Sequence, residues 1–158
     1  MELSGCRERT LRLLQCLLEH SPPDRLGPRG YAALLPPGGQ MNPDILRMNE
    51  RAVAIVREFA LADKPIAAIC HGVQVLVAVP EVIKGKRVAG LFTTRPEVEL
   101  TGATYVPIGG KDALRDGNLV TAEGWTALAA FIREYLGVLG TEIIHHPIGQ
   151  TQGMQAAE

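Results

Sequence analysis

The sequence predicts an α/β fold in which a parallel sheet is covered by helices on both faces. Short apolar runs of strand length alternate with segments of helical periodicity, and several of the apolar runs end at glycine- or proline-containing turns. The length of 158 residues fits a single domain. The expected strands are residues 31–35, 66–69, 103–106 and 119–121, and residues 84–89 are expected to return the chain to the sheet.

Helices are expected between these strands. Asn42-Pro43-Asp44 is typical of a helix start, with Asn as the N-cap, Pro at the first helical position and an acid in the first turn. Two further short helices are expected over residues 73–79, limited by Pro80, and over 96–100. The helix that begins near Asn42 is expected to bury Ile45, Met48, Ala52, Val56 and Phe59, and a last helix over 125–139 is expected to bury Leu128, Phe131, Ile132, Tyr135 and Leu136.

The two ends of the chain differ in character from its middle. Residues 3–19 have helical periodicity, residues 21–30 form a connector rich in proline and glycine, and residues 147–158 form a loose tail. We therefore divide the chain into an atypical N-terminal helix and linker (1–30), a domain (31–146) and a tail (147–158).

Composition excludes several classes of protein. The net charge of -1, with both signs interspersed, predicts no nucleic-acid partner. No apolar run approaches the ~18 residues of a membrane span, and no signal-peptide pattern is present, so we expect no membrane association and a cytoplasmic location. The three cysteines form no disulfide framework or zinc knuckle, and Cys6 and Cys16 are interpreted as incidental. His145-His146 lacks a third ligand at suitable spacing, so no metal site is expected.

The chemistry centres on Cys70. The buried strand before it turns within one residue into a helix, and small residues, Ala68 and Gly72, stand two positions to either side. Such an elbow exposes the side chain at the sheet edge, and the dipole of the following helix favours thiolate over thiol. The alternative is a small buried hydrophobic side chain, but the Cys-His-Gly turn favours a nucleophile.

Three nearby features are candidate partners, each with a purely structural alternative. The His71 backbone N–H and the backbone N–H groups of Gly38-Gly39 are candidate oxyanion donors; the glycine pair is as readily explained as a plain turn. The His71 ring is a candidate base or acid, or a partly exposed histidine at a helix start. Asp44 either orients His71 as a triad acid or complements the helix dipole in the first turn.

Several segments together resemble the PfpI-like superfamily, over about residues 31–144. This group includes intracellular cysteine peptidases, the parkinsonism-associated deglycase and glutathione-independent glyoxalases, on a fold shared with class I glutamine amidotransferases. Residues 95–100 and 139–143 are similar to the glyoxalase-like branch and residues 49–53 to the peptidase branch. The segments that carry the resemblance are Leu-Pro-Pro-Gly-Gly (35–39), Asn-Glu-Arg-Ala-Val (49–53), Lys-Pro-Ile-Ala-Ala-Ile-Cys-His-Gly (64–72), Lys-Gly-Lys (84–86) and Asp-Gly-Asn-Leu-Val-Thr (116–121).

The resemblance implies a flavodoxin-like sheet, Cys70 as nucleophile, His71 beside it, oxyanion donors near Gly39, no cofactor and a homo-oligomer. Asp44 falls where peptidase members carry a glutamate that reaches the histidine, in some cases across a subunit interface, and it is one methylene shorter. Nothing in residues 1–30 matches the family's first strand and its glutamate. We therefore expect an incomplete domain behind a foreign or mis-framed start.

Two classes of function follow from these residues. The first is a cofactor-independent cysteine enzyme, either a hydrolase or a glyoxalase-type lyase, acting on a small carbonyl or a peptide through the Cys70 thiolate. The second is a non-catalytic redox or stress-response protein in which Cys70 is oxidised. An inactive, truncated family member that pairs its open sheet edges with another chain is the remaining alternative.

Overall fold

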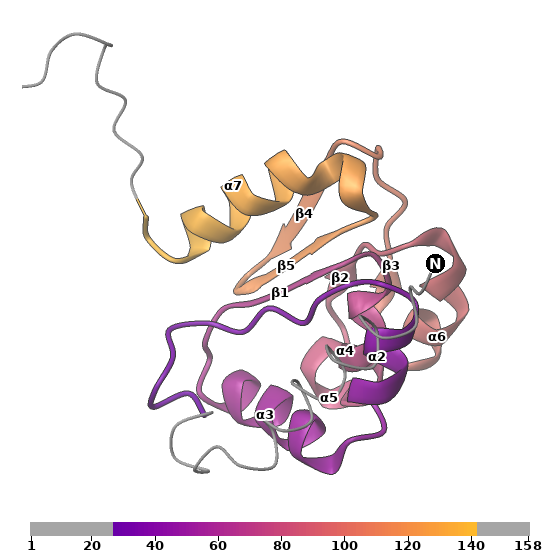
Figure 1. The fold of residues 1–158 in the computed structure, drawn as a ribbon. Helices are drawn as coiled ribbons and strands as arrows, with labels where there is room; N and C mark the ends of the chain where they lie inside the picture. The colour runs from indigo at the N-terminus through magenta and orange to yellow at the C-terminus, as the bar shows by residue number, and fades with distance from the viewer. Residues whose placement is uncertain (1–26, 142–158) are drawn as a thin grey trace, which may run out of the picture.

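The computed structural model describes residues 27–141, and its main sheet has three strands in the order β1-β5-β4 (Figure 1). Strand β1 (Ile66–Ile69) pairs in parallel with β5 (Leu119–Ala122), and β4 (Ala113–Asp116) pairs antiparallel with β5. On the other side of β1, Leu34 forms a single parallel bridge to Ile66. The α/β class and the strand before Cys70 are thus confirmed.

The sheet differs from the prediction in three places. Strand β4 was not expected, because Ala113–Asp116 has little apolar character; it pairs with β5 through a turn at Gly117, whose φ is +61°. The predicted strand 31–35 is reduced to the Leu34 bridge. Strands β2 (Arg87–Val88) and β3 (Thr104–Tyr105) form a separate two-stranded parallel sheet.

The predicted helix after Asn42 is two helices, α2 (Met41–Leu46) and α3 (Glu50–Leu61). Asn42 lies inside α2 and does not cap it; the side-chain cap belongs to Asn49, which accepts a hydrogen bond from Ala52 N–H at 3.0 Å. The chain turns between the helices, so the predicted burial of Ile45 and Met48 is wrong: they are 39% and 81% exposed. The expected burial of the α3 side chains Ala52, Val56 and Phe59 is confirmed.

The remaining helices are short, apart from the last. Two agree closely with expectation: α4 (Val73–Val77) and α6 (Arg95–Leu100). Pro80 lies at the N-terminal end of a further helix, α5 (Pro80–Ile83). Within residues 27–141 the last helix is α7 (Leu128–Val138), and the 3₁₀ turns are η1 (Cys70–Gly72), η2 (Phe92–Thr94) and η3 (Trp125–Ala127).

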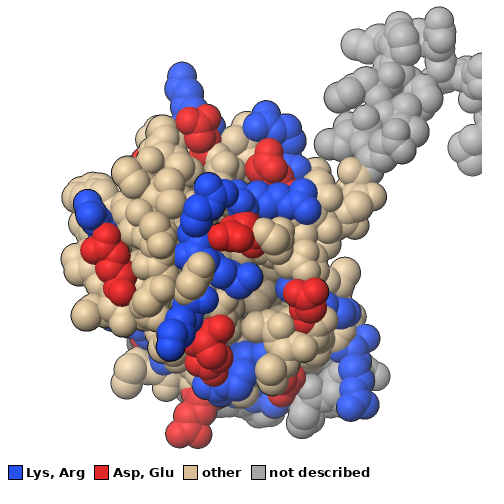
Figure 2. Space-filling view, turned by 180° about the vertical axis from the view of Figure 1, so that it is seen from behind, with Lys and Arg blue, Asp and Glu red and all other residues tan. Residues whose placement is uncertain are grey.

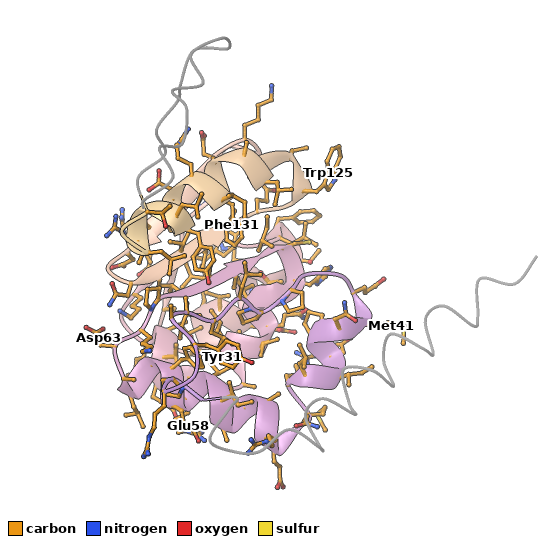
Figure 3. All side chains as sticks on the ribbon, turned by 60° about the vertical axis from the view of Figure 1, so that its left-hand side comes forward. Tyr31, Met41, Glu58, Asp63, Trp125 and Phe131 are labelled. Atoms are coloured by element: carbon orange, nitrogen blue, oxygen red, sulfur yellow. The ribbon has the colours of Figure 1, made fainter. Side chains whose placement is uncertain are left out.

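Two apolar clusters cover the two faces of the sheet. Alternation along β1 sends Ile66 and Ala68 into the cluster with α3 and α4, and Ala67 into the cluster under α7, which includes Phe131. Figures 1 and 3 show α7 alone on one face, with Phe131 beneath it and Trp125 projecting away from the molecule. Leu128 and Ile132 are 51% and 38% exposed, so their predicted burial is wrong.

Some sequence-based expectations lie outside the described residues. These are the helix over 3–19, Cys6 and Cys16, and His145-His146 with the tail that follows. Within residues 27–141, no helix has the length and apolar character needed to cross a membrane. Charged side chains of both signs are interspersed over the face shown in Figure 2.

Tyr105 ties β3 to the segment that follows β2. Its hydroxyl donates a hydrogen bond to the Gly90 carbonyl at 2.8 Å. Burial, reinforced by the negative charge of Glu123, raises the pKa of Tyr105 above its ordinary value of 10.0. The folded protein therefore holds this phenolic proton more tightly than the unfolded chain does.

This gives a pH prediction for Tyr105→Phe. The tyrosine's contribution to stability is complete below about pH 10, the reference pKa of tyrosine, and is lost as pH rises through the folded pKa. The variant should be less stable near neutral pH by about 0.5–1.5 kcal/mol, the value of a hydrogen bond. It should then lose less stability than wild type in alkali. Urea unfolding at neutral pH and above the tyrosine pKa measures both effects. Tyr31→Phe, at an exposed tyrosine, is the control and should lose stability in alkali as wild type does. An equal loss of stability in wild type and both variants would contradict the prediction.

Candidate active site

The candidate site lies at the edge of the sheet where the parallel strands end. Cys70 directly follows β1, and Glu123 directly follows β5, whose last residue Ala122 is in register with Ile69. The Gly38-Gly39 turn follows the Leu34 bridge at the same edge. In open α/β sheets this edge, at the carboxyl ends of the strands, is where ligands bind.

The strand-to-helix turn at Cys70 is built as the sequence predicted. Ile69 is extended, Cys70 has φ of +60°, and the chain continues directly into η1 and α4. Within residues 27–141, Asp63 is the other non-glycine residue with positive φ, and aspartate tolerates this conformation far better than most side chains. A cysteine held there costs about 1–3 kcal/mol, and such strain is concentrated at functional sites. The Cys70 side chain is a free thiol and is half-buried.

Glycines allow the loop before α2 to lie against this turn. A Cβ on Gly72 would come within 2.7 Å of the Pro36 carbonyl oxygen and 3.2 Å of that of Pro37. A Cβ on Gly38 would come within 2.9 Å of the Ile69 carbonyl oxygen and 3.2 Å of Cys70 Cβ. The backbone of the glycine turn is therefore brought next to the cysteine.

The two predicted oxyanion donors, Gly39 and His71, directly follow Gly38 and Cys70, the two residues that lie against each other. Gly39 has φ of +89°, which favours glycine, and its N–H makes no backbone hydrogen bond within the described residues. His71 is the second residue of η1, where N–H groups lack an acceptor within the helix. The oxyanion role of both groups remains a prediction.

The His71 ring is held by residues that the sequence analysis missed. Its Nδ1 lies 3.0 Å from Gln74 Oε1, and Gln74 Nε2 donates to the Glu97 carboxylate at 3.1 and 3.4 Å. Arg47 donates to the same carboxylate at 3.3 Å. Gln74 stands three residues after His71, a helical spacing that signals a neighbour; nothing local in the sequence connects Glu97 or Arg47 to it.

Asp44 does not contact the histidine directly. Its carboxylate forms an ion pair with Arg47 at 2.7 Å, and its side chain is 52% exposed. Asp44 is thus connected to His71 only through Arg47, Glu97 and Gln74 in turn. The direct contact expected of a triad acid is absent from this chain's structure, because the neighbouring arginine occupies the carboxylate.

The described residues offer no second centre of this kind. A hollow of about 140 Å³ lies at the opposite end of β1, lined in part by Asp63, Lys64, Glu81 and Lys86, and no cysteine, serine or histidine lines it. No group of three or more His, Cys, Asp or Glu side chains within 27–141 is arranged to hold a metal ion. The elbow is therefore the candidate site.

Comparison with known proteins gives one consistent family. A profile of the DJ-1/PfpI family matches residues 22–137. The chain is 36% identical over 116 residues to a deglycase of Thermococcus kodakarensis, a match covering 73% of this chain and 67% of the relative. It is 39% identical over 111 residues to the putative cysteine protease YraA of Bacillus subtilis, covering 69% and 62%. The chain thus spans about two thirds of the length of these relatives.

A solved structure agrees with the sequence matches. A two-domain protein of Anabaena variabilis, with DJ-1/ThiJ/PfpI-like and ferritin-like domains, is 31% identical with a TM-score of 0.66. The match covers 78% of this chain and 32% of that protein.

Proposed function

Because this chain belongs to the DJ-1/PfpI family, we propose that it is a cysteine enzyme that acts on small carbonyl compounds, with methylglyoxal as the test substrate. The observation that carries the proposal is Cys70, a free and half-buried thiol in a left-handed backbone conformation at a strand-to-helix turn. The deglycase name of a relative 36% identical to this chain supports the same class of chemistry.

The proposed reaction needs no cofactor. The Cys70 thiolate adds to the aldehyde carbon, a C–S bond forms, and the oxygen takes a proton to give a hemithioacetal. A base removes the hydrogen from that carbon as a proton, and the neighbouring ketone carbon is protonated in turn. The product is a thioester of lactate, which water cleaves to lactate and the free thiol. One carbon is oxidised and its neighbour is reduced, so no external oxidant is consumed.

Each nearby group has a role in this scheme. The N–H groups of Gly39 and His71 are the proposed donors to the oxygen that becomes negative when the thiolate adds. His71 is the proposed base, since it follows the nucleophile directly in the sequence and its ring is held by Gln74. Asp44 contributes at a distance through Arg47. The protein is further proposed to form a homo-oligomer and to be located in the cytoplasm. Size-exclusion chromatography tests the oligomeric state.

The direct test is a lactate assay with the purified chain and methylglyoxal. Turnover without added thiol or metal is the expected result. Lactate at the rate of the uncatalysed reaction, together with a mass gain on Cys70 after peroxide treatment, would instead favour a redox sensor. Cleavage of a peptide without lactate formation would favour the peptidase chemistry suggested by the putative cysteine protease relative.

A further inference from the structure

We propose that Gln74 and Glu97 fix the His71 ring in one tautomer, with the proton on Nδ1 and the lone pair on Nε2. In this arrangement Gln74 is a positioning residue for His71 and Glu97 sets the direction of Gln74. The base role of His71 rests on the proposed function, but the tautomer itself does not.

Glu97 determines the orientation of the Gln74 amide, because a carboxylate only accepts hydrogen bonds. Both of its oxygens lie within hydrogen-bond distance of the Gln74 side-chain nitrogen, at 3.4 and 3.1 Å. The amide of Gln74 must therefore turn its NH₂ group toward Glu97. The alternative orientation would place a carbonyl oxygen against two carboxylate oxygens.

The orientation of Gln74 then decides the state of the histidine. With its nitrogen committed to Glu97, the amide presents Oε1 to His71 Nδ1 at 3.0 Å. An amide oxygen accepts and cannot donate, so Nδ1 must carry the proton. In a neutral ring the lone pair is then on Nε2, because the hydrogen bond at one nitrogen sets the state of the other. No hydrogen bond to Nε2 is present within residues 27–141.

Two further charges keep Glu97 in place. Arg47, the residue directly after α2, donates to Glu97 on α6 at 3.3 Å, and Asp44 pairs with the same guanidinium at 2.7 Å. The Arg47 and Glu97 side chains are both partly shielded from solvent. The carboxylate therefore accepts hydrogen bonds from both Arg47 and Gln74, and α4, which carries Gln74, packs against both α2 and α6.

The consequence is a histidine whose Nε2 already carries the lone pair needed to accept a proton. A ring protonated on Nε2 would need a tautomer exchange before that nitrogen could accept a proton. Fixing the tautomer in advance is the role that a triad acid performs in hydrolases. Here the neutral amide of Gln74 performs it, and the Glu97 carboxylate acts on Gln74 rather than on the histidine itself.

The test is the ¹⁵N NMR spectrum of the full chain labelled in its histidines, recorded where the rings are neutral. Long-range ¹H–¹⁵N correlations report which ring nitrogen carries the proton, and His71→Gln identifies the signal of His71 among those of the four histidines. The expected wild-type spectrum shows His71 protonated on Nδ1 alone. A proton on Nε2 would overturn the proposal.

Variants of the same size separate this inference from a general structural role. Glu97→Gln can donate or accept, so the Gln74 amide is free to turn over, and a mixture of tautomers is expected. The double variant Gln74→Glu/Glu97→Gln places the carboxylate beside His71 and the amide beyond it, and should restore protonation on Nδ1. Glu99→Gln on the same helix, where Glu99 pairs with Arg95 at 2.9 Å, is the matched control and should leave the signal unchanged.

The outcome for the tautomer is independent of the outcome for the enzyme. If the wild-type ring is protonated on Nδ1 but no lactate forms, the inference stands and the proposed function fails. If lactate forms but Glu97→Gln leaves the tautomer unchanged, the function stands and the inference fails.

Discussion

Cys70→Ser is expected to lower the rate of lactate formation by about 10³-fold or more, because an unactivated hydroxyl cannot replace the thiolate as nucleophile. The fold should survive, since serine is nearly the same size and has the same backbone demands at φ of +60°. The measurement is initial lactate rate, with the thermal unfolding midpoint recorded on the same preparation.

The control for this prediction is the double variant Cys6→Ser/Cys16→Ser, which leaves Cys70 as the single thiol of the chain. It should keep the wild-type rate. Full activity in Cys70→Ser would remove the elbow from the mechanism, and loss of activity in the control would show that Cys70 is not the one cysteine that the reaction needs.

The elbow could be predicted from the sequence because its determinants are local. A four-residue apolar strand, a cysteine and a glycine two residues later lie within seven positions, from Ile66 to Gly72. Each satisfies a backbone requirement of the turn itself, and the structure adds the reason for Gly72: the carbonyl of Pro36 passes where a side chain would stand. The function of the cysteine was thus inferred from the same residues that shape the backbone.

The contacts around His71 could not be predicted because they join distant parts of the chain. Glu97 is 23 residues from Gln74 and 50 from Arg47, and these three meet only once α2, α4 and α6 have packed. The sequence analysis offered Asp44 as the partner of His71 instead, because Asp44 falls where peptidase members of the resembling family carry a glutamate that reaches the histidine. In the structure Arg47, three residues after Asp44, forms an ion pair with the Asp44 carboxylate.

The errors in the fold have a similar origin. The spacing of apolar residues predicted one helix that runs through Met48. In the structure the Asn49 side chain caps a new helix, which begins at Glu50. Strand β4 carries few apolar residues, so its existence depends on pairing with β5 rather than on its own pattern. Tertiary contacts decided both cases.

Gly72→Ala is expected to reduce the free energy of unfolding by about 1–3 kcal/mol, the usual cost of overpacking. The backbone at this position, with φ of -56° and ψ of -26°, accepts any residue, so the whole effect comes from the added methyl group. That group would lie 2.7 Å from the Pro36 carbonyl oxygen, and a backbone oxygen cannot move without shifting the loop that carries Gly38 and Gly39.

Activity should therefore fall together with stability in Gly72→Ala, because the same loop carries a proposed oxyanion donor next to Cys70. Gly137→Ala is the matched control: it lies in α7, and nothing stands within 4 Å of the added Cβ. The control should gain about 0.5–1 kcal/mol, as alanine does over glycine inside a helix, and keep its rate. Urea unfolding and the lactate assay on both variants separate a steric effect at the elbow from a general effect of replacing glycine. A stable Gly72→Ala protein with wild-type activity would show that the loop need not touch the elbow for catalysis.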